Sequence, residues 1–177
     1  DCEWVHKRTI PEVTCKVEGK AVFEFEGIKC LLKVGRWQLR GFKEVWEYQI
    51  KKGYQLQYYN VSENEGVYFV RSGRFMVEVD GEVLFASCDE GDLIHIPAYT
   101  PYALTAVSDD CVIHDYNVTA HLFRLLEMIE AARNNFPEKL EDPEYMKYLF
   151  KVNKVRNFTK FEKSLLMVTD YVDPLKQ

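Results

Sequence analysis

The stretch from Gly66 to Tyr102 constrains the fold most, because two short apolar runs flank Asp80-Gly81 and a third run ends at Pro97. An Asp-Gly pair supplies the positive backbone φ that a two-residue β-hairpin turn requires. Gly73 precedes the hairpin and Gly91-Asp92 precedes the third run, at the spacing of an antiparallel barrel or sandwich. The stretch therefore predicts a hairpin that is followed by another strand.

Five further segments carry the signs of short strands. Residues 21–26 read AVFEFE, and IKCLLKV follows after a turn at Gly27; EVWEYQIKK and YQLQYYN flank Gly53, and residues 111–117 read CVIHDYN. In the third of these segments, Trp46, Tyr48 and Ile50 share one parity, so they are expected on one face of a half-buried sheet. With eight to ten short strands and short connections, we predict an all-β antiparallel barrel over residues 21–118.

The hydrophobic period changes after Thr119. Apolar residues then recur at intervals of three and four, at Leu122, Leu125, Leu126, Ile129 and Ala132, which predicts an amphipathic helix with Thr119 as its N-cap. Asp142-Pro143-Glu144 has the composition of a second helix start. We therefore expect an N-terminal arm over residues 1–20, the barrel, and a helical C-terminal extension over residues 119–177.

Composition narrows the classes of partner. The net charge is −5, from 23 basic and 28 acidic residues that are interleaved along the chain. Because there is no long basic run, neither nucleic acid nor an anionic membrane is expected as a partner. No apolar run approaches the roughly 20 residues of a membrane span, and no signal peptide is visible, although a removed leader stays open. Five cysteines without a C-x-x-C pair indicate reduced thiols and a cytoplasmic protein.

From residue 40 to residue 118, the order of these signals resembles the cupin superfamily. The second cupin motif has a glycine, five residues, a proline, one residue, a glycine, two residues and a histidine. Residues 91–97, GDLIHIP, match its opening, while Tyr99 replaces the second glycine and Tyr102 replaces the histidine. The resemblance implies a cupin barrel, also called a double-stranded β-helix or jelly roll. The tail LFRLLEMIEAARNNFP resembles the helical extension of quercetin-dioxygenase-like cupins.

The first cupin motif implies three more metal ligands, two histidines and a glutamate. Anchoring that motif on Gly53 places Tyr59 and Val61 at the histidines, and anchoring it on Gly73 places Gly66 at the glutamate. None of these side chains is an imidazole or a carboxylate, which are the donors that such a metal site needs. We therefore expect neither a metal nor another cofactor.

Tyrosines stand where the metal ligands are missing. If Gly66 faces inward, alternation places Tyr68 on the same interior wall. Motif position places Tyr59 in the same interior, and it places Tyr102 on the opposite wall, also pointing inward. These phenols, together with Tyr116, are the predicted ligand-binding residues. The alternative is that the aromatic rings fill the interior. Arg71 is a candidate for gripping a carboxylate or phosphate at the barrel mouth, or else an ordinary surface arginine.

His95 and His114 are the histidines in the predicted barrel strands, and each is either a pocket base or a structural imidazole. Metal-free sugar epimerases and ketoisomerases of the cupin superfamily pair a histidine base with a tyrosine acid. The resemblance thus makes His114, His95 and Tyr102 the candidate catalytic residues, although parity alone does not decide which histidine faces inward.

These residues lead to one preferred function and two alternatives. We expect the barrel to bind a small aromatic or cyclic organic molecule without a metal, and we leave open whether the molecule is turned over. The first alternative is a metal-independent isomerase, epimerase or lyase that uses a His/Tyr pair. The second is a quercetinase-like dioxygenase with an unrecognised metal site. A homodimer is expected, because such barrels often pair through their sheets.

Overall fold

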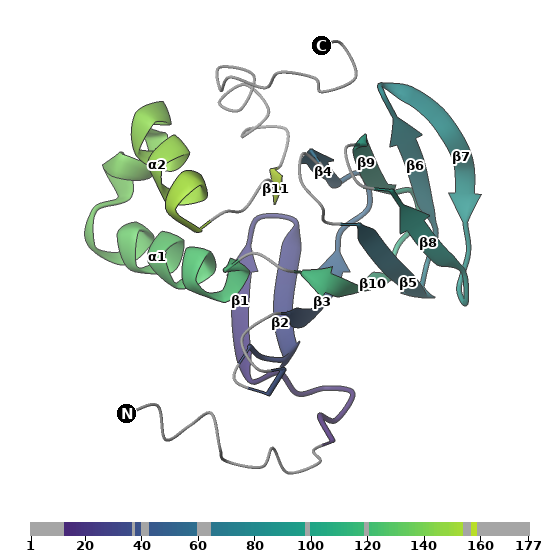
Figure 1. Cartoon of the computed structure of the whole chain (residues 1–177), viewed down its shortest axis with the longest axis horizontal. Coiled ribbons are helices and arrows are strands. Elements are labelled where there is room, and N and C mark those ends of the chain that lie inside the picture. The colour runs from purple at the N-terminus through teal and green to yellow at the C-terminus, as the bar shows by residue number, and fades with distance from the viewer. Residues whose placement is uncertain are drawn as a thin grey trace.

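The computed structural model describes residues 13–36, 38–39, 43–59, 65–97, 100–118, 121–153 and 157–158. Within these residues strands are the most frequent secondary structure (Figure 1). The strands are β1 Ala21–Phe25, β2 Ile28–Val34, β3 Glu44–Ile50, β4 Gln55–Tyr59, β5 Gly66–Ser72, β6 Phe75–Val79, β7 Glu82–Cys88, β8 Leu93–Ile96, β9 Pro101–Ala106, β10 Cys111–Val118 and β11 Asn157–Phe158. The helices are α1 Leu122–Asn135, the 3₁₀ helix η2 Pro137–Glu141 and α2 Pro143–Asn153.

The strands form two antiparallel sheets. One has the order β1-β2-β3-β10-β5-β8, and the other has the order β11-β4-β9-β6-β7. In the first sheet β10 lies between β3 and β5, so that residues far apart in sequence become neighbours. The predicted all-β antiparallel architecture is confirmed. Strand β9 had no clear signal of its own, because Ala and Thr dilute the hydrophobic pattern of PYALTA, yet it pairs with both β4 and β6.

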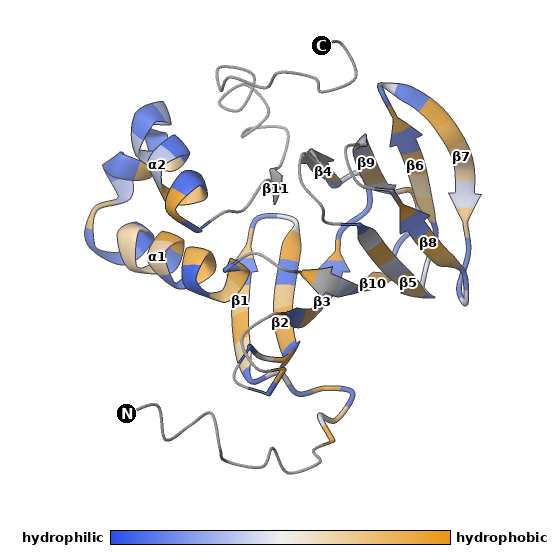
Figure 2. Cartoon of the chain, in the orientation of Figure 1, coloured by the Kyte–Doolittle hydropathy of each residue, from blue (hydrophilic) through white to orange (hydrophobic). Residues whose placement is uncertain are grey.

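Alternation along the strands separates the core from the outer faces. On β3, Trp46, Tyr48 and Ile50 are buried on one face, as their shared parity predicts. From the second sheet, Phe75 and Leu104 reach the same hydrophobic core. Figure 2 shows how the hydrophobic residues gather in the strands. Burying each large apolar side chain stabilises the fold by about 1.5–3 kcal/mol relative to its exposure.

The predicted hairpin is present between β6 and β7. Asp80 and Gly81 both have positive φ, at 52° and 84°, as a two-residue type I′ turn requires. Gly73, at φ 74°, turns the chain between β5 and β6. Strand β8 ends just before Pro97, which also agrees with the sequence pattern.

The start of α1 differs from its prediction. Thr119 lies outside the described residues, and the N-cap is His121, whose side chain makes no capping hydrogen bond. The cap comes instead from the neighbouring sheet, because Glu44 on β3 accepts a hydrogen bond from the backbone N–H of Phe123 at 3.2 Å. A long-range contact of this kind has no local signature.

The start of α2 agrees with the sequence. Asp142 Oδ1 accepts a hydrogen bond from the backbone N–H of Glu144 at 3.0 Å, with Pro143 at the first helical position. Both helices bury one side, through Leu125 on α1 and Leu149 on α2, and these side chains belong to the same hydrophobic cluster as the buried strand residues. None of the helices in the described ranges is long and apolar enough to cross a membrane.

Candidate functional site

Two of the predicted phenols meet in the barrel interior. The hydroxyl groups of Tyr68 on β5 and Tyr102 on β9 lie 2.5 Å apart, and the residues are 2% and 6% exposed. Their rings are arranged edge to face, with centroids 6.0 Å apart. Burying a phenol hydroxyl is costly unless it is hydrogen-bonded, so this contact stabilises both. The side chain of Tyr59, the third predicted phenol, lies outside the described residues.

A carboxylate and a further phenol join this interior, and neither was predicted from the sequence as a site residue. Asp115 on β10 is buried and accepts a hydrogen bond from the hydroxyl of Tyr48 at 3.1 Å. Burial raises the pKa of Tyr102 well above its ordinary value of 10, and the negative charge of Asp115 raises it further, while the hydrogen bond with Tyr68 lowers it in part. Tyr102 therefore remains a protonated phenol at neutral pH. The parity of Asp115 with buried Ile113 was the available signal.

The described ligand positions do not fit the usual cupin metal. By the motif comparison these positions are Gly66 and Tyr102; a Cβ added to Gly66 would lie only 3.0 Å from the Tyr102 hydroxyl oxygen. The phenol thus fills the space beside Gly66, and neither position offers an imidazole or a carboxylate. Over the described residues, no three His, Cys, Asp or Glu side chains converge on a point that could hold a metal ion. Val61 lies outside the described residues.

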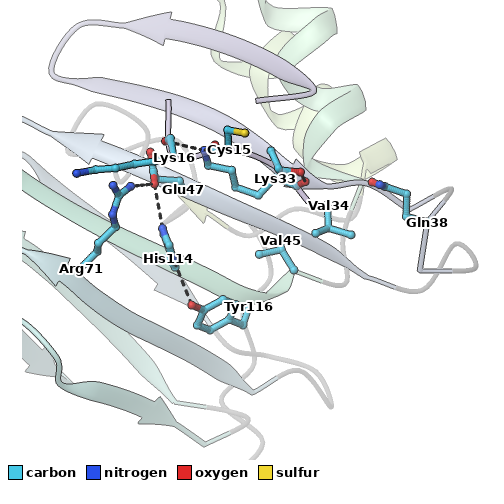
Figure 3. Close-up of a pocket in the computed structure, with 11 residues that line it drawn as sticks. Cys15, Lys16, Lys33, Val34, Gln38, Val45, Glu47, Arg71, His114 and Tyr116 are labelled. Atoms are coloured by element: carbon cyan, nitrogen blue, oxygen red, sulfur yellow. Dashed lines mark hydrogen bonds and ion pairs between the residues drawn. The ribbon is translucent and has the colours of Figure 1, made fainter. Parts of the chain in front are cut away.

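Three other predicted site residues lie on the opposite face of the first sheet. His114 and Tyr116 on β10 and Arg71 on β5 line an open cavity of about 690 Å³ outside the barrel. The cavity is also lined by side chains of β2 and β3 and by residues 14–16 of the arm (Figure 3). The barrel-mouth position expected of Arg71 and the interior position considered for His114 are therefore not what the structure shows.

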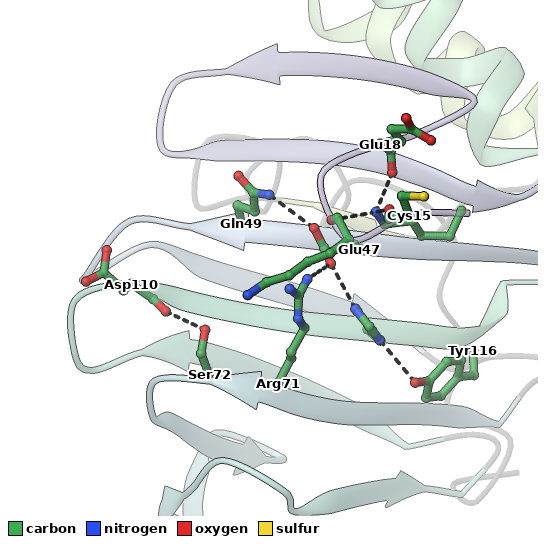
Figure 4. Close-up of polar contacts among 11 residues, drawn as sticks. Cys15, Glu18, Glu47, Gln49, Arg71, Ser72, Asp110 and Tyr116 are labelled. Carbon is green, nitrogen blue, oxygen red and sulfur yellow. Dashed lines mark hydrogen bonds and ion pairs between the residues drawn. The ribbon is translucent and has the colours of Figure 1, made fainter. Parts of the chain in front are cut away.

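Glu47 on β3 organises this outer cavity. It is fully buried, and its Oε1 contacts Arg71 Nη1 and lies 2.9 Å from His114 Nε2 (Figure 4). Its Oε2 accepts a hydrogen bond from Gln49 Nε2 at 3.1 Å. On its other side, His114 Nδ1 lies 3.1 Å from the hydroxyl of Tyr116. Glu47 was not predicted, because in the sequence it is one polar residue of an amphipathic strand.

The arm forms one wall of the cavity. Lys33 on β2 donates hydrogen bonds from Nζ to the carbonyl oxygens of Cys15 and Lys16, at 3.2 and 3.1 Å, and to that of Glu18. Thr14 Oγ1 in turn donates to the carbonyl of Lys33 at 2.8 Å. These contacts hold residues 14–18 of the arm over the outer face of β2. No strand is present in residues 13–20, so an edge strand, if the arm has one, lies outside the described residues.

His95 belongs to neither group. It is exposed on β8, and its Nε2 lies 3.3 Å from Glu65 Oε2, which is equally exposed. An ion pair between exposed groups contributes little to stability. The structure therefore places the candidate residues in two clusters, one inside the barrel and one on its outer face, and leaves His95 apart from both.

The lowered pKa of Glu47 predicts how the stability of the protein depends on pH. Burial raises the pKa of this carboxyl, but the hydrogen bonds from His114 and Gln49 and the charges of Lys33 and Arg71 together outweigh burial, so its pKa lies below the ordinary 4.5. The charged Glu47 carboxylate thus contributes its full stabilisation above pH 4.5, and this stabilisation is lost as the pH falls through the lowered pKa of the folded state. Urea unfolding between about pH 5 and about pH 3 should show a steeper loss for wild type than for Glu47→Gln. Parallel pH profiles would contradict the prediction.

No protein-family model matches the sequence. No curated protein matches it either.

Solved structures do resemble the fold. KdgF from Halomonas sp. aligns with a TM-score of 0.51 at 16% identity, over 62% of this chain and 94% of its own. A predicted oxalate decarboxylase from Thermotoga maritima aligns with a TM-score of 0.50 at 8% identity, over 62% and 99%. An RmlC-like cupin from Shewanella frigidimarina aligns with a TM-score of 0.47 at 17% identity, over 62% and 94%. At such identities the similarity concerns the fold alone.

Proposed function

We propose that this chain, a cupin by its fold, binds a small aromatic or cyclic organic molecule inside its barrel without a metal. The observation that carries the proposal is the buried pair of phenols, Tyr68 and Tyr102, which face one another from the two sheets. Phenol rings offer flat apolar surfaces, and their hydroxyl groups can donate or accept hydrogen bonds. Such a combination is typical of pockets for small organic molecules.

The charge of the interior favours a neutral ligand. Asp115 places a negative charge among otherwise apolar walls, where repulsion between like charges is stronger than in water. Tyr102 stays protonated beside it, so the interior offers both hydrogen-bond donors and acceptors. A neutral molecule with hydroxyl groups is therefore a better candidate than an organic anion.

Catechol and benzoate test this proposal as a pair of probes, because they share a ring and differ in charge. Saturation-transfer NMR should detect catechol binding and weaker or no benzoate binding. Tyr102→Phe removes one hydrogen-bonding hydroxyl and is expected to weaken catechol binding by about tenfold. Tyr148→Phe, on the exposed face of α2, is the matched control and should bind like wild type.

Two results would count against binding in the barrel. If catechol does not bind to wild type, the aromatic rings fill the interior, which is the alternative considered above. If catechol binds equally well to wild type and Tyr102→Phe, the molecule binds elsewhere. The homodimer stays a separate prediction, which light scattering of the purified chain would check.

A further inference from the structure

We propose that the outer cavity is a second site, in which Tyr116, His114 and Glu47 transfer a proton to or from a small organic acid. The cavity lies on the opposite face of the sheet from the barrel interior, so this proposal does not depend on ligand binding in the barrel. It rests on the order of the three polar groups, on their graded exposure and on the cations beside them.

The hydroxyl of Tyr116, the imidazole of His114 and the carboxylate of Glu47 are connected in series by two hydrogen bonds. A neutral imidazole carries one N–H donor and one acceptor nitrogen. Because Glu47 is an acceptor 2.9 Å from Nε2, the hydrogen of His114 belongs on Nε2. The other nitrogen, Nδ1, then accepts from the Tyr116 hydroxyl at 3.1 Å. In hydrolases the same order of groups lets the imidazole take the proton of a hydroxyl group, while the carboxylate holds the imidazole in the required tautomer.

Solvent exposure decreases from Tyr116 through His114 to Glu47, so the phenol is the group in this series that a ligand can reach. Tyr116 is 39% exposed and lines the cavity, the His114 side chain is 21% exposed, and Glu47 is not exposed at all. Figure 3 shows the imidazole between the carboxylate and the phenol. Tyr116 would therefore touch the substrate, His114 would relay the proton, and Glu47 would position His114 through a contact that solvent does not reach.

The charges of the cavity favour an anion. Three cations, Arg71, Lys16 and Lys33, line it with a single carboxylate, Glu47. Lys33 is occupied by carbonyl groups of the arm. Arg71 donates one hydrogen bond, from Nη1 to Glu47, and its other N–H groups have no hydrogen-bond partner among the described residues. A guanidinium with unused N–H groups suits a carboxylate, which makes a small organic acid the fitting class of ligand.

In the proposed step the substrate loses a proton from carbon. The C–H bond next to the carbonyl of a 2-oxo acid breaks, and its electron pair remains on the substrate as an enolate. Its proton passes to the Tyr116 oxygen while the phenol proton passes to His114 Nδ1, which produces an imidazolium beside the Glu47 carboxylate. Burial raises the pKa of Tyr116 above 10, so the phenol is not ionised at rest. A relay through the neutral phenol agrees with that state, and the reverse step returns the proton to carbon.

Pyruvate in D₂O is a direct probe, because each cycle of this step replaces a methyl hydrogen by deuterium. Proton NMR should show the methyl signal fading at least about tenfold faster with wild type than in buffer alone. Tyr116→Phe and His114→Gln should each lower the protein-dependent rate by at least about tenfold. Tyr148→Phe, which removes an exposed hydroxyl on α2, should leave the rate unchanged. Exchange no faster than in buffer, or equal in wild type and Tyr116→Phe, would overturn the proposal.

A second measurement determines the tautomer of His114, on which the proton relay depends, without any substrate. Nitrogen-15 NMR of the histidines should show that the neutral imidazole of His114 in wild type carries its hydrogen on Nε2 and not on Nδ1. Glu47→Gln removes the charged acceptor and should mix the two tautomers, a change that loss of packing alone would not produce in a folded variant. A His114 that carries its hydrogen on Nδ1 in wild type would overturn the assigned direction of transfer and the role of Tyr116 with it.

Discussion

Replacing Gly73 by Ala is expected to lower the free energy of unfolding by about 4 kcal/mol. Gly73 has φ 74°, a conformation that costs about 1–2 kcal/mol for a residue with a Cβ. The new Cβ would also lie 2.7 Å from Cys111 Sγ and 2.8 Å from Cys111 Cα. Because Cys111 begins β10, relief requires movement of the backbone of the strand at the centre of the first sheet.

Gly53→Ala is the matched control for this prediction. Gly53 has nearly the same backbone conformation, φ 84°, but nothing within 4 Å of an added Cβ. It should lose only the conformational part, about 1–2 kcal/mol. Urea unfolding followed by circular dichroism measures both variants against wild type. Equal losses at the two glycines would show that the contact with Cys111 contributes nothing.

Replacing Glu44 by Ala is expected to lower the free energy of unfolding by about 3 kcal/mol. Glu44 is buried, and its carboxylate accepts hydrogen bonds from Trp46 Nε1 at 2.8 Å, from Arg36 Nε at 3.1 Å and from the backbone N–H of Phe123. Its removal leaves the buried indole N–H and the first turn of α1 without acceptors, and a buried unsatisfied donor costs about 1–3 kcal/mol.

Glu130→Ala on α1 is the control. It distinguishes the loss of the buried hydrogen bonds of Glu44 from the effect of removing a glutamate side chain in general. Glu130 pairs with Arg133 at 3.7 Å, and both side chains are exposed, so its removal should change stability by no more than about 0.5 kcal/mol. Hydrogen exchange adds a local readout, because Glu44→Ala should expose the amides of the first turn of α1 more than Glu130→Ala does. If both variants lose the same stability, then Glu44 does not cap the helix to any measurable extent.

Much of the fold could be predicted, because its signals are local. Asp80-Gly81 tolerates the positive φ of a tight hairpin turn, which the two residues adopt here. Alternation on β3 places Trp46 and Tyr48 on one face wherever the strand lies. Asp142 and Pro143 start α2 through contacts within one turn. The start of α1 could not be found in this way, because its cap is a side chain 79 residues away in sequence.

The candidate site was predictable only in part. Motif position and parity placed Tyr68 and Tyr102 on facing walls, and the structure brings their hydroxyl groups together. Parity also links His114 to Tyr116, but it does not say which face of the sheet is the interior. Glu47 escaped prediction because it becomes a buried carboxylate only through Arg71 and His114, which are 24 and 67 residues away.

The sequence by itself determined the turns, the alternating faces of the strands, the start of α2 and the absence of the usual metal ligands from the cupin motif positions. Each of these depends on backbone conformation or on residue identity over a few neighbouring positions. The tertiary structure alone decided that β10 lies between β3 and β5 and that the arm crosses the outer face of β2. These long-range contacts bury Glu47, align His114 with Tyr116 and divide the predicted residues between the barrel interior and an outer cavity. The physical reason is that burial and hydrogen bonding depend on which strands become neighbours, and alternation within a single strand carries no information about its neighbours.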